Sequence, residues 1–281
     1  MPLFNRVTIV GLGLIGGSVG MAIRRRRLAR EVVGLSRTMA TVRLAKARGA
    51  IDTGTTHAAR AVRDADLVIL ATPVERIIPY ATYVARFMRP GSILTDVGSV
   101  KGPMVRALTG TLPHGVAFVG AHPLAGSVQR GIGAARADLL DGSVCIVTRT
   151  AKTHPRALAQ VRRAWKALAC RVLVMPPTMH DRLIAATSHL PHVLAFCLVE
   201  ATPHQALATA PRSFLEATRV AKSDPDLWDD ILLGNRQAVL AAMDRFHRRW
   251  TRLRRLLVRE NPRALKRLLH HAQAIRHTLH D

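Results

Sequence analysis

A glycine-rich turn near the start of the chain constrains the fold more than any other feature. The apolar stretch 7–10 before it is typical of a short buried strand, and residues 17–23 after it can form a helix. Between strand and helix, such glycines allow a tight bend, close approach of a pyrophosphate and close helix packing. Free N–H groups at the helix start would bind the phosphates, although an ordinary Gly-rich turn remains the alternative. The predicted dinucleotide-binding residues are Gly11, Gly13, Leu14, Ile15 and Gly16.

Apolar strand-like stretches then alternate with amphipathic helices as far as Met175. The expected strands are 31–36, 66–71, 92–97, 116–120, 144–148 and 171–175. Alternation of this kind predicts an α/β fold with a doubly wound, mostly parallel sheet, whereas no strand is expected after Met175. We therefore expect a Rossmann-type dinucleotide-binding domain in residues 1–176 and an all-helical domain in residues 177–281.

The second part of the chain reads as helices only. Residues 181–200 form an apolar helical stretch that Pro191 should bend. Asp224 and Pro225 suit the start of a long helix with apolar residues near a 3.6 period as far as Leu257, and Asn261 precedes a last helix. Because this apolar face exceeds what one small bundle needs, we predict a homodimer that forms through the helical domain.

The chain is strongly basic, with 42 Lys and Arg against 18 Asp and Glu and a formal net charge of +24. Such a surface attracts polyanions. Aromatic residues make up only 4%, however, and no finger or RNP-like pattern is present. We therefore interpret the charge as an arginine bias on solvated faces that also attracts anionic substrates, and we expect no specific nucleic acid partner.

Cysteine usage and hydropathy indicate a cytoplasmic protein. The three cysteines, Cys145, Cys170 and Cys197, are far apart among apolar neighbours and predict reduced thiols without a metal site. No apolar run is expected to approach the ~20 residues of a membrane span, and the N-terminus lacks a secretory pattern. We therefore expect no membrane association.

The end of the second strand indicates which dinucleotide is bound. An acidic residue there would bind the ribose 2′-hydroxyl of NAD, whereas a small residue followed by Arg accommodates the 2′-phosphate of NADP. The sequence has Ser36 and Arg37, which favours NADP, with NAD possible if Arg37 is only a solvated arginine. Thr72 and Pro73 follow a buried strand and are candidates to touch the ribose or the nicotinamide.

Three places could carry the chemistry of a nicotinamide enzyme. His122 follows a strand in the first domain and precedes a proline, and imidazole is the usual base near neutral pH. Residues 188–192 place two histidines in an apolar helix, where they are either functional or core histidines with satisfied hydrogen bonds. Arg219 could bind a carboxylate through its guanidinium fork, although a solvated arginine is the simpler interpretation.

Taken together, these segments resemble the prephenate/arogenate dehydrogenase family of tyrosine biosynthesis. They occur in family order between residue 7 and about residue 240. The set of His-Pro-x-Ala-Gly, Ser-His-Leu-Pro-His and Ser-Asp-Pro is far more specific than the glycine turn alone. The matching segments are 11–18, 71–74, 96–101, 122–127, 188–192, 218–221 and 223–225, with Trp228 and Asn235.

The resemblance implies an oxidative decarboxylation without a metal. Hydride would pass from the ring carbon bearing the hydroxyl to the nicotinamide, and carbon dioxide would leave as the ring becomes aromatic. His122 would take the hydroxyl proton, and Ser99 would bind the hydroxyl and hold His122 in place. Arg219 would bind the ring carboxylate and Trp228 would shield the pocket. The other residues expected to line it are Ser127, Ser188 and His192.

Two positions depart from the family pattern. Val128 stands where many members carry Glu, and Glu216 stands where Asp is common, three residues before Arg219. If those acids gate entry or balance Arg219, gating and substrate preference are altered here. We also expect control by tyrosine to act at the active site itself, since the chain ends with its helical domain.

The sequence leaves several functions open. Prephenate and arogenate share the ring chemistry and differ only at the side chain, so the residues do not separate them. A related two-domain NADP oxidoreductase, acting on 4-amino-4-deoxyprephenate, an imine or a 3-hydroxyacid, is the nearest alternative. A non-catalytic nucleotide-sensing or nucleic-acid-binding Rossmann protein is a more distant one, against which the set of His122, Ser99 and Arg219 argues.

Overall fold

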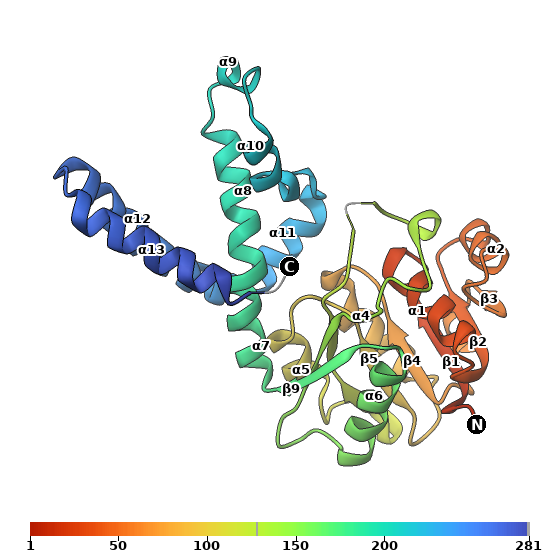
Figure 1. Cartoon of the computed structure of the whole chain (residues 1–281). Helices are drawn as coiled ribbons and strands as arrows, with labels where there is room; N and C mark the ends of the chain where they lie inside the picture. Colours follow the sequence, from red (N-terminus) through yellow and green to blue (C-terminus); the bar gives the residue numbers. More distant parts are fainter. Residues whose placement is uncertain (128, 280–281) are drawn as a thin grey trace.

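The chain consists of a sheet half, up to residue 176, and a helical half from residue 177 onward (Figure 1). The computed structural model describes residues 1–127 and 129–279. A parallel sheet with helices on both faces, followed by helices alone, confirms the expected fold class. The border between two domains at residue 176 stays a prediction.

The main sheet has six parallel strands in the order β3-β2-β1-β4-β5-β6. The order reverses between β1 and β4, and open sheets of this kind bind ligands beyond the carboxyl ends of the strands at that point. Its strands are β1 Phe4–Val10, β2 Ala29–Leu35, β3 Thr53–Thr55, β4 Leu67–Leu70, β5 Ile93–Asp96 and β6 Ala117–Val119. The helices between them are α1 Leu14–Arg25, α2 Met39–Ala47, α3 Ala58–Val62, α4 Val74–Ala85 and α5 Gly102–Leu108.

Alternating side chains of the central strands build two cores, one on each face of the sheet. On β4, Leu67 and Ile69 join the core under α1 and α6 (Pro155–Ala167). Val68 and Leu70 join the opposite core, under α4 and α5. All four side chains are buried, because a parallel strand covered on both faces has no solvent side.

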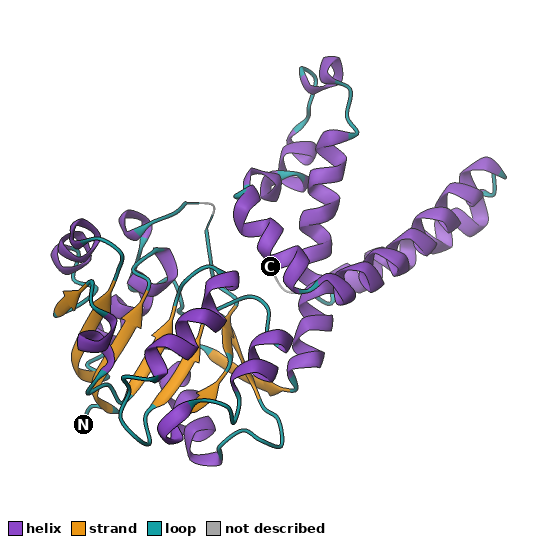
Figure 2. Ribbon diagram, turned by 180° about the vertical axis from the view of Figure 1, so that it is seen from behind, coloured by secondary structure: helices purple, strands orange, loops and turns teal. Residues whose placement is uncertain are grey.

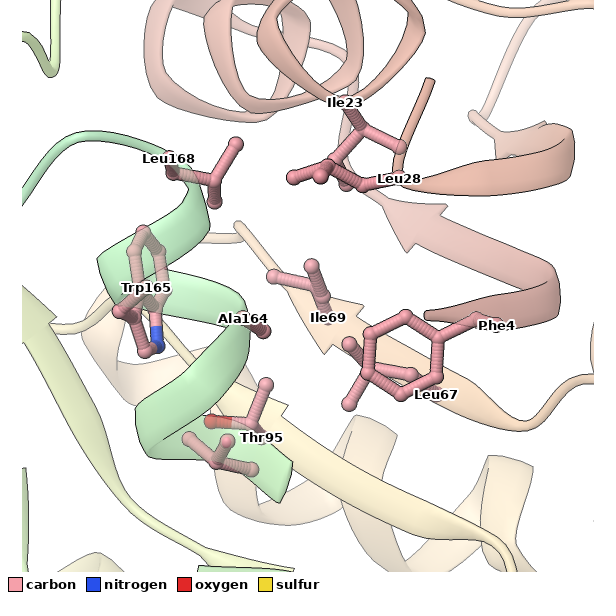
Figure 3. Close-up of a pocket in the computed structure, with 10 residues that line it drawn as sticks. Phe4, Ile23, Leu28, Leu67, Ile69, Thr95, Ala164, Trp165 and Leu168 are labelled. Atoms are coloured by element: carbon pink, nitrogen blue, oxygen red, sulfur yellow. The ribbon is translucent and has the colours of Figure 1, made fainter. Parts of the chain in front are cut away.

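Helix α6 packs closely against the sheet. Figure 3 shows the side chains around a cavity of about 10 Å³ between α6 and the sheet. Its wall includes Trp165 of α6 and Leu168, which lies just beyond the end of that helix. The one polar side chain in its wall, Thr95, donates its hydroxyl to the Val119 carbonyl at 2.6 Å. A void this small and apolar holds one water at most, so it belongs to core packing.

The last three strands form a second sheet instead of extending the first. It contains β7 Ala121–Pro123, β8 Val144–Thr148 and β9 Arg171–Met175. β7 runs antiparallel to β8, and β9 runs parallel to β8. His122 of β7 lies opposite Ile146 of β8. The chain leaves the main sheet after β6 because the Ala121 N–H binds the Asp96 carboxylate at 3.2 Å and Thr148 binds the Gly120 carbonyl. A single sheet was expected, so this is a correction.

The helical half begins with one helical run that contains a π turn. α7 Pro177–Ile184 passes through the π turn Ala185–His189 into α8 Leu190–Glu200. The Leu190 N–H reaches back five residues to the Ala185 carbonyl, which is the π pattern. Pro191, which has no N–H to donate, is the second residue of α8, two positions after the turn. The irregularity expected near Pro191 is thus a π turn just before it, while a bend at Pro191 stays a prediction.

A second difference concerns the long helix expected from Asp224 to Leu257. It is divided at Asn235 into α11 Pro225–Gly234 and α12 Arg236–Val258. The side-chain amide of Asn235 turns inward and donates to the Asp181 carbonyl at 2.9 Å. The remaining elements of this half are α9 His204–Leu207, α10 Arg212–Ala217, the short 3₁₀ turn η4 Arg219–Lys222 and α13 Pro262–His277.

Helices α12 and α13 form an antiparallel arm that extends away from the sheet (Figures 1 and 2). Only Val239 and Ala242 of α12 are buried, and no residue of α13 is. Large apolar side chains therefore face outward from this arm and from α8. The exposed ones are Leu198, Val199, Leu240, Met243, Phe246, Trp250, Leu257, Val258, Leu269 and Ile275.

The run Pro177–Glu200 corrects one expectation about hydropathy. It is 24 residues long, and its most apolar window has a mean hydropathy of 1.4 with 22% of the window buried. By length and composition alone it could therefore cross a membrane, because the π turn joins two apolar segments into one helix. Length and composition do not separate such a span from an apolar helix that packs against protein.

Candidate active site

The glycine turn has the geometry of a dinucleotide cradle. Gly11 has φ +95°, and a Cβ there would lie 2.4 Å from the Ala71 carbonyl oxygen. A Cβ on Gly16 would lie 1.9 Å from the Gly11 oxygen, so α1 can approach the sheet only with glycine at this position. A Cβ on Gly13 would meet nothing within 4 Å, which leaves open space at the N-terminus of α1. No side chain caps this helix end, and no acid lies in its first turn.

The carboxyl end of β4 fits the same ligand. The Thr72 hydroxyl is buried and has no hydrogen-bond partner among the described residues. Pro73 precedes α4 as its N-cap. An unpaired buried hydroxyl is costly, and a ribose or carboxamide group of a bound dinucleotide would satisfy it. At the end of β2, Ser36 is partly buried and Arg37 is exposed, with no acid at either position.

His122 lies on β7 and is held from the helical half. Its Nδ1 lies 2.8 Å from Nε2 of His180 on α7. The Nδ1 of His180 lies 2.8 Å from the Asp181 carboxylate. His180 is fully buried and Asp181 nearly so, whereas His122 is only partly buried. The three side chains form a continuous hydrogen-bonded chain from one half of the molecule to the other.

Both ends of this chain are anchored in the loop after β5. The Asp181 carboxylate accepts the backbone N–H groups of Lys101 and Gly102, each at 2.8 Å. The Lys101 ammonium binds the Asp96 carboxylate, and both side chains are fully buried. Asp96 also accepts the N–H of Ala121, next to His122. The loop thereby fixes β7 and α7 relative to each other.

The histidines of this cluster are neutral near pH 7. Burial lowers the pKa of His122 well below its ordinary value, and the nearby His180 and Lys101 lower it further. Burial also lowers the pKa of His180, against the opposing effect of the Asp181 carboxylate. A neutral imidazole that is partly open to solvent can accept a proton, which is what a general base requires.

The second histidine cluster surrounds Trp228 of α11. His192 stacks on the indole, with ring centroids 3.5 Å apart and planes 22° apart, and its Nδ1 donates to the Ser188 carbonyl at 2.9 Å. His189 meets the same indole edge-on at 5.9 Å. The Asn235 amide, which binds Asp181, also lies 3.2 Å from Nδ1 of His189. Asn235 thus links the two clusters.

Arg219 in η4 is exposed and belongs to this second cluster. Its turn packs against α8, the helix that carries His192. Burial lowers the pKa of His192, and the guanidinium of Arg219 lowers it further. Among the described residues Arg219 has no ion-pair partner, because Glu216 pairs instead with Arg212 at 2.8 Å. Glu216 therefore does not neutralise Arg219, and its guanidinium is available to an anion.

The two predicted serines of the sheet half lie nearby without direct contacts to the histidines. Ser99 is partly buried and is followed by Val100, which packs against Trp228. The expected Ser99 contact with His122 is not seen in the described part of the chain, where His180 binds the His122 ring instead. Ser127 is exposed and accepts the Gln129 N–H at 3.1 Å. Val128 lies outside the described residues.

Sequence reasoning brought together His122, Ser188, His192, Arg219 and Trp228, but it gave no role to several partners. His180 and Asp181 were given no place in the site, and Asp96, Lys101 and Asn235 were noted only as parts of motifs. A histidine followed by an aspartate inside an apolar helix was the one available signal, since such groups are costly unless they are paired.

Comparisons with known proteins agree with this geometry. The family model described as "Prephenate dehydrogenase, nucleotide-binding domain" matches residues 19–174, and "Prephenate dehydrogenase, dimerization domain" matches residues 176–271. The chain belongs to the prephenate dehydrogenase family. Both halves are covered, which confirms the resemblance inferred from the short motifs.

Individual relatives support the same assignment. The chain is 35% identical to a cyclohexadienyl dehydrogenase from Zymomonas mobilis over 88% of this chain and 86% of that protein. It is 32% identical to a prephenate dehydrogenase from Bacillus subtilis over 94% of this chain and 73% of that protein. Among solved structures, prephenate dehydrogenase from A. aeolicus in complex with hydroxyphenyl propionate and NAD+ has a TM-score of 0.92 and 33% identity, with 98% of each chain covered.

Proposed function

We propose that this protein catalyses the NAD(P)-dependent oxidative decarboxylation of prephenate or arogenate in tyrosine biosynthesis. The observation that carries the proposal is the pairing of a neutral, anchored imidazole with an unpaired guanidinium. His122 is bound by His180 at 2.8 Å, while Arg219 has no ion-pair partner among the described residues. Both are needed for an acidic substrate that must lose a hydroxyl proton.

When bound, the dinucleotide would supply the hydride acceptor for the ring carbon that carries the hydroxyl. His122 accepts the hydroxyl proton as that carbon becomes a carbonyl. The bond between the ring and its carboxylate then breaks, its electron pair enters the ring, carbon dioxide leaves, and the ring oxygen takes back the proton held on His122. Aromatisation makes this step effectively irreversible, so the residues need only bind, orient and deprotonate.

The remaining site residues position the substrate. Arg219 binds the ring carboxylate, which a guanidinium fork holds in one orientation. Ser99 hydrogen-bonds the ring hydroxyl near His122. Trp228 and His192, stacked on each other, form an apolar wall of the pocket. Ser127 and Ser188 supply further hydrogen bonds around the substrate.

The cofactor is bound by the glycine turn together with Thr72 and Pro73, and we expect NADP to be preferred to NAD. Arg37 at the end of β2 is exposed and could pair with a 2′-phosphate, while Ser36 leaves room for it. The relative from A. aeolicus was solved with NAD+, which makes NAD the alternative for this chain.

One assay tests the proposal and its finer points together. Purified protein is mixed with prephenate or arogenate and with NAD or NADP, and the absorbance of the reduced nicotinamide is followed. We expect turnover with at least one substrate, and a higher kcat/KM with NADP. No turnover in any of the four combinations would overturn the function, and a higher kcat/KM with NAD would overturn the role of Arg37.

We further propose a homodimer through the helical half. Large apolar side chains of α8 and α12 are exposed, and an extended apolar surface of this kind is typical of an interface. The family model that matches residues 176–271 is described as a dimerization domain. A second copy would cover this surface and thereby bury the apolar run 177–200 against protein. On this proposal the protein works in the cytoplasm, without a membrane or nucleic acid partner.

A further inference from the structure

The hydrogen-bonded chain Asp181–His180–His122 does more than hold a ring in place. We propose that His180 and Asp181 are positioning residues that fix the tautomer of His122, so that its Nε2 carries the free lone pair. This inference rests on the proposed function of His122 as the base. The tautomer of His122 follows from which atoms donate and which accept in the hydrogen bonds of Asp181 and His180.

The first contact defines Asp181 as an acceptor. Its two oxygens accept the N–H groups of Lys101 and Gly102, each at 2.8 Å, and peptide N–H groups can only donate. Burial opposes ionisation, but the hydrogen bonds from His180 and from these two amides hold the pKa of Asp181 below its ordinary value. An ionised carboxylate accepts only, so the His180 nitrogen at 2.8 Å must donate.

The second contact follows from the first. A neutral imidazole carries one N–H, and in His180 that proton is on Nδ1, facing Asp181. Its Nε2 is then an acceptor, and Nδ1 of His122 at 2.8 Å must supply the proton. His180 is fully buried, so water does not compete for this nitrogen. His122 consequently has its proton on Nδ1 and a bare Nε2.

The groups around His180 favour this arrangement from both sides. Lys101, from the loop before α5, lowers the pKa of His180 and keeps the ring neutral, and its own charge is balanced by Asp96. His189, from the π turn, is a further basic group near His122. Asp181 and, more weakly, Asp96 oppose them by raising the pKa of His180, and Asp181 contacts Nδ1, on the side of the ring away from His122.

The chain also prepares His122 for the proton it receives. When Nε2 accepts the hydroxyl proton, His122 becomes an imidazolium whose Nδ1–H is already bound to His180. The negative charge of Asp181 lies one ring further along the same chain. No group needs to rotate during the reaction, which is how preorganised sites lower a barrier.

Two substitutions of His180 separate positioning from packing. Leucine fills the space but cannot accept a hydrogen bond, whereas the glutamine side-chain oxygen can take the place of Nε2. We expect His180→Leu to lower kcat by about 10²-fold with little change in KM, since general-base catalysis contributes about 10²–10⁴-fold. We expect His180→Gln to recover about tenfold of that loss. Equal kcat values in the two variants would overturn the proposal.

Nitrogen-15 NMR of the histidine rings provides a test that needs no turnover. At pH 7.5 we expect the ring of His122 to be neutral, with Nδ1 protonated and Nε2 bare. The signal is assigned by its loss in His122→Asn, and in His180→Leu we expect it to show both tautomers. A wild-type ring protonated on Nε2 would overturn the inference even if the enzyme is active. The expected tautomer in an inactive protein would leave the inference standing and refute only the proposed function.

Discussion

The sheet half and the helical half bury their apolar side chains in different ways. Every residue of β4 and β5 is buried between helices of the same chain. In contrast, α12 has 23 residues of which two are buried, and α13 has none. The sheet half therefore completes its own core, whereas the helical half leaves large apolar side chains exposed, which is the surface proposed above to bind a second copy.

The proposed function also divides the chemistry between the two halves. The sheet half would contribute the dinucleotide cradle and His122, while the helical half would contribute Arg219, Trp228 and the residues proposed to orient His122. A substitution at His122 should therefore affect the chemical step, whereas one in the helical half, outside His180 and Asp181, should affect binding or assembly. Four predictions test this division.

The largest effect is expected from His122→Asn in the sheet half. The amide has no basic lone pair, so it cannot take the hydroxyl proton, and kcat should fall by about 10²-fold or more. Dinucleotide binding, measured by fluorescence titration, should change much less. His204→Asn, at an exposed histidine of α9, is the matched control and should keep full activity. An unchanged kcat in His122→Asn would remove this residue as the base.

The next effect is expected from Arg219→Ala in the helical half. Loss of the guanidinium removes the partner of the ring carboxylate, so the substrate KM should rise by about 10-fold to 10²-fold while kcat changes less. Arg162→Ala, at an exposed arginine of α6 in the sheet half, is the control and should leave KM unchanged. A loss confined to kcat would mean that Arg219 acts in the chemical step and that the division is wrong.

A matched pair of charge insertions tests the apolar surface. Leu257 in α12 is 55% exposed and Leu44 in α2 is 48% exposed, so the two side chains are similarly exposed in a single chain. We expect Leu257→Glu to weaken dimerisation by about 30-fold, or about 2 kcal/mol, because the dimer would bury the new charge. Leu44→Glu should have no effect. Analytical ultracentrifugation measures both, and equal dissociation constants would exclude α12 from the interface.

The smallest effect concerns the stability of the helical half at low pH. Burial lowers the pKa of His189 from 6.5 to about 4, so the unfolded chain binds this proton more readily than the folded one. The free energy of unfolding should therefore fall as the pH drops below 6.5. The contribution of His189 to this fall should end near pH 4. His189→Gln should remove about 1 kcal/mol of the loss between pH 7.5 and 5.5, measured by urea unfolding. An unchanged pH dependence would show that folding does not lower the pKa of His189.

Local sequence patterns predicted the parts of the molecule that depend on neighbours along the chain. The glycine turn and a buried strand at 66–71, observed as 67–70, follow from residue types within a few positions, and so does the choice of His122 as the candidate base. The contact of His180 with His122 spans 58 positions, and no periodicity indicates it. The second sheet was missed because a strand sequence does not specify its neighbour.

Breaks within regular elements were the other source of error. The expected helix from Asp224 to Leu257 has a continuous apolar pattern, yet it divides at Asn235 because this side chain binds Asp181 and lies against His189. Periodicity cannot foresee a break that is stabilised from a distant segment. The site residues most difficult to predict are thus those that connect the two halves.

The π turn at Ala185–His189 behaves as a single-residue insertion in an α-helix. One extra residue rotates everything beyond it by about 100° relative to an uninterrupted helix. Upstream lie His180 and Asp181, of which His180 binds the ring of His122, and downstream lies His192, which stacks on Trp228. Removing one residue here would leave the composition of the helix almost unchanged, but it would rotate His192 relative to His180 and Asp181. The length of this segment therefore matters to the site as much as its side chains do.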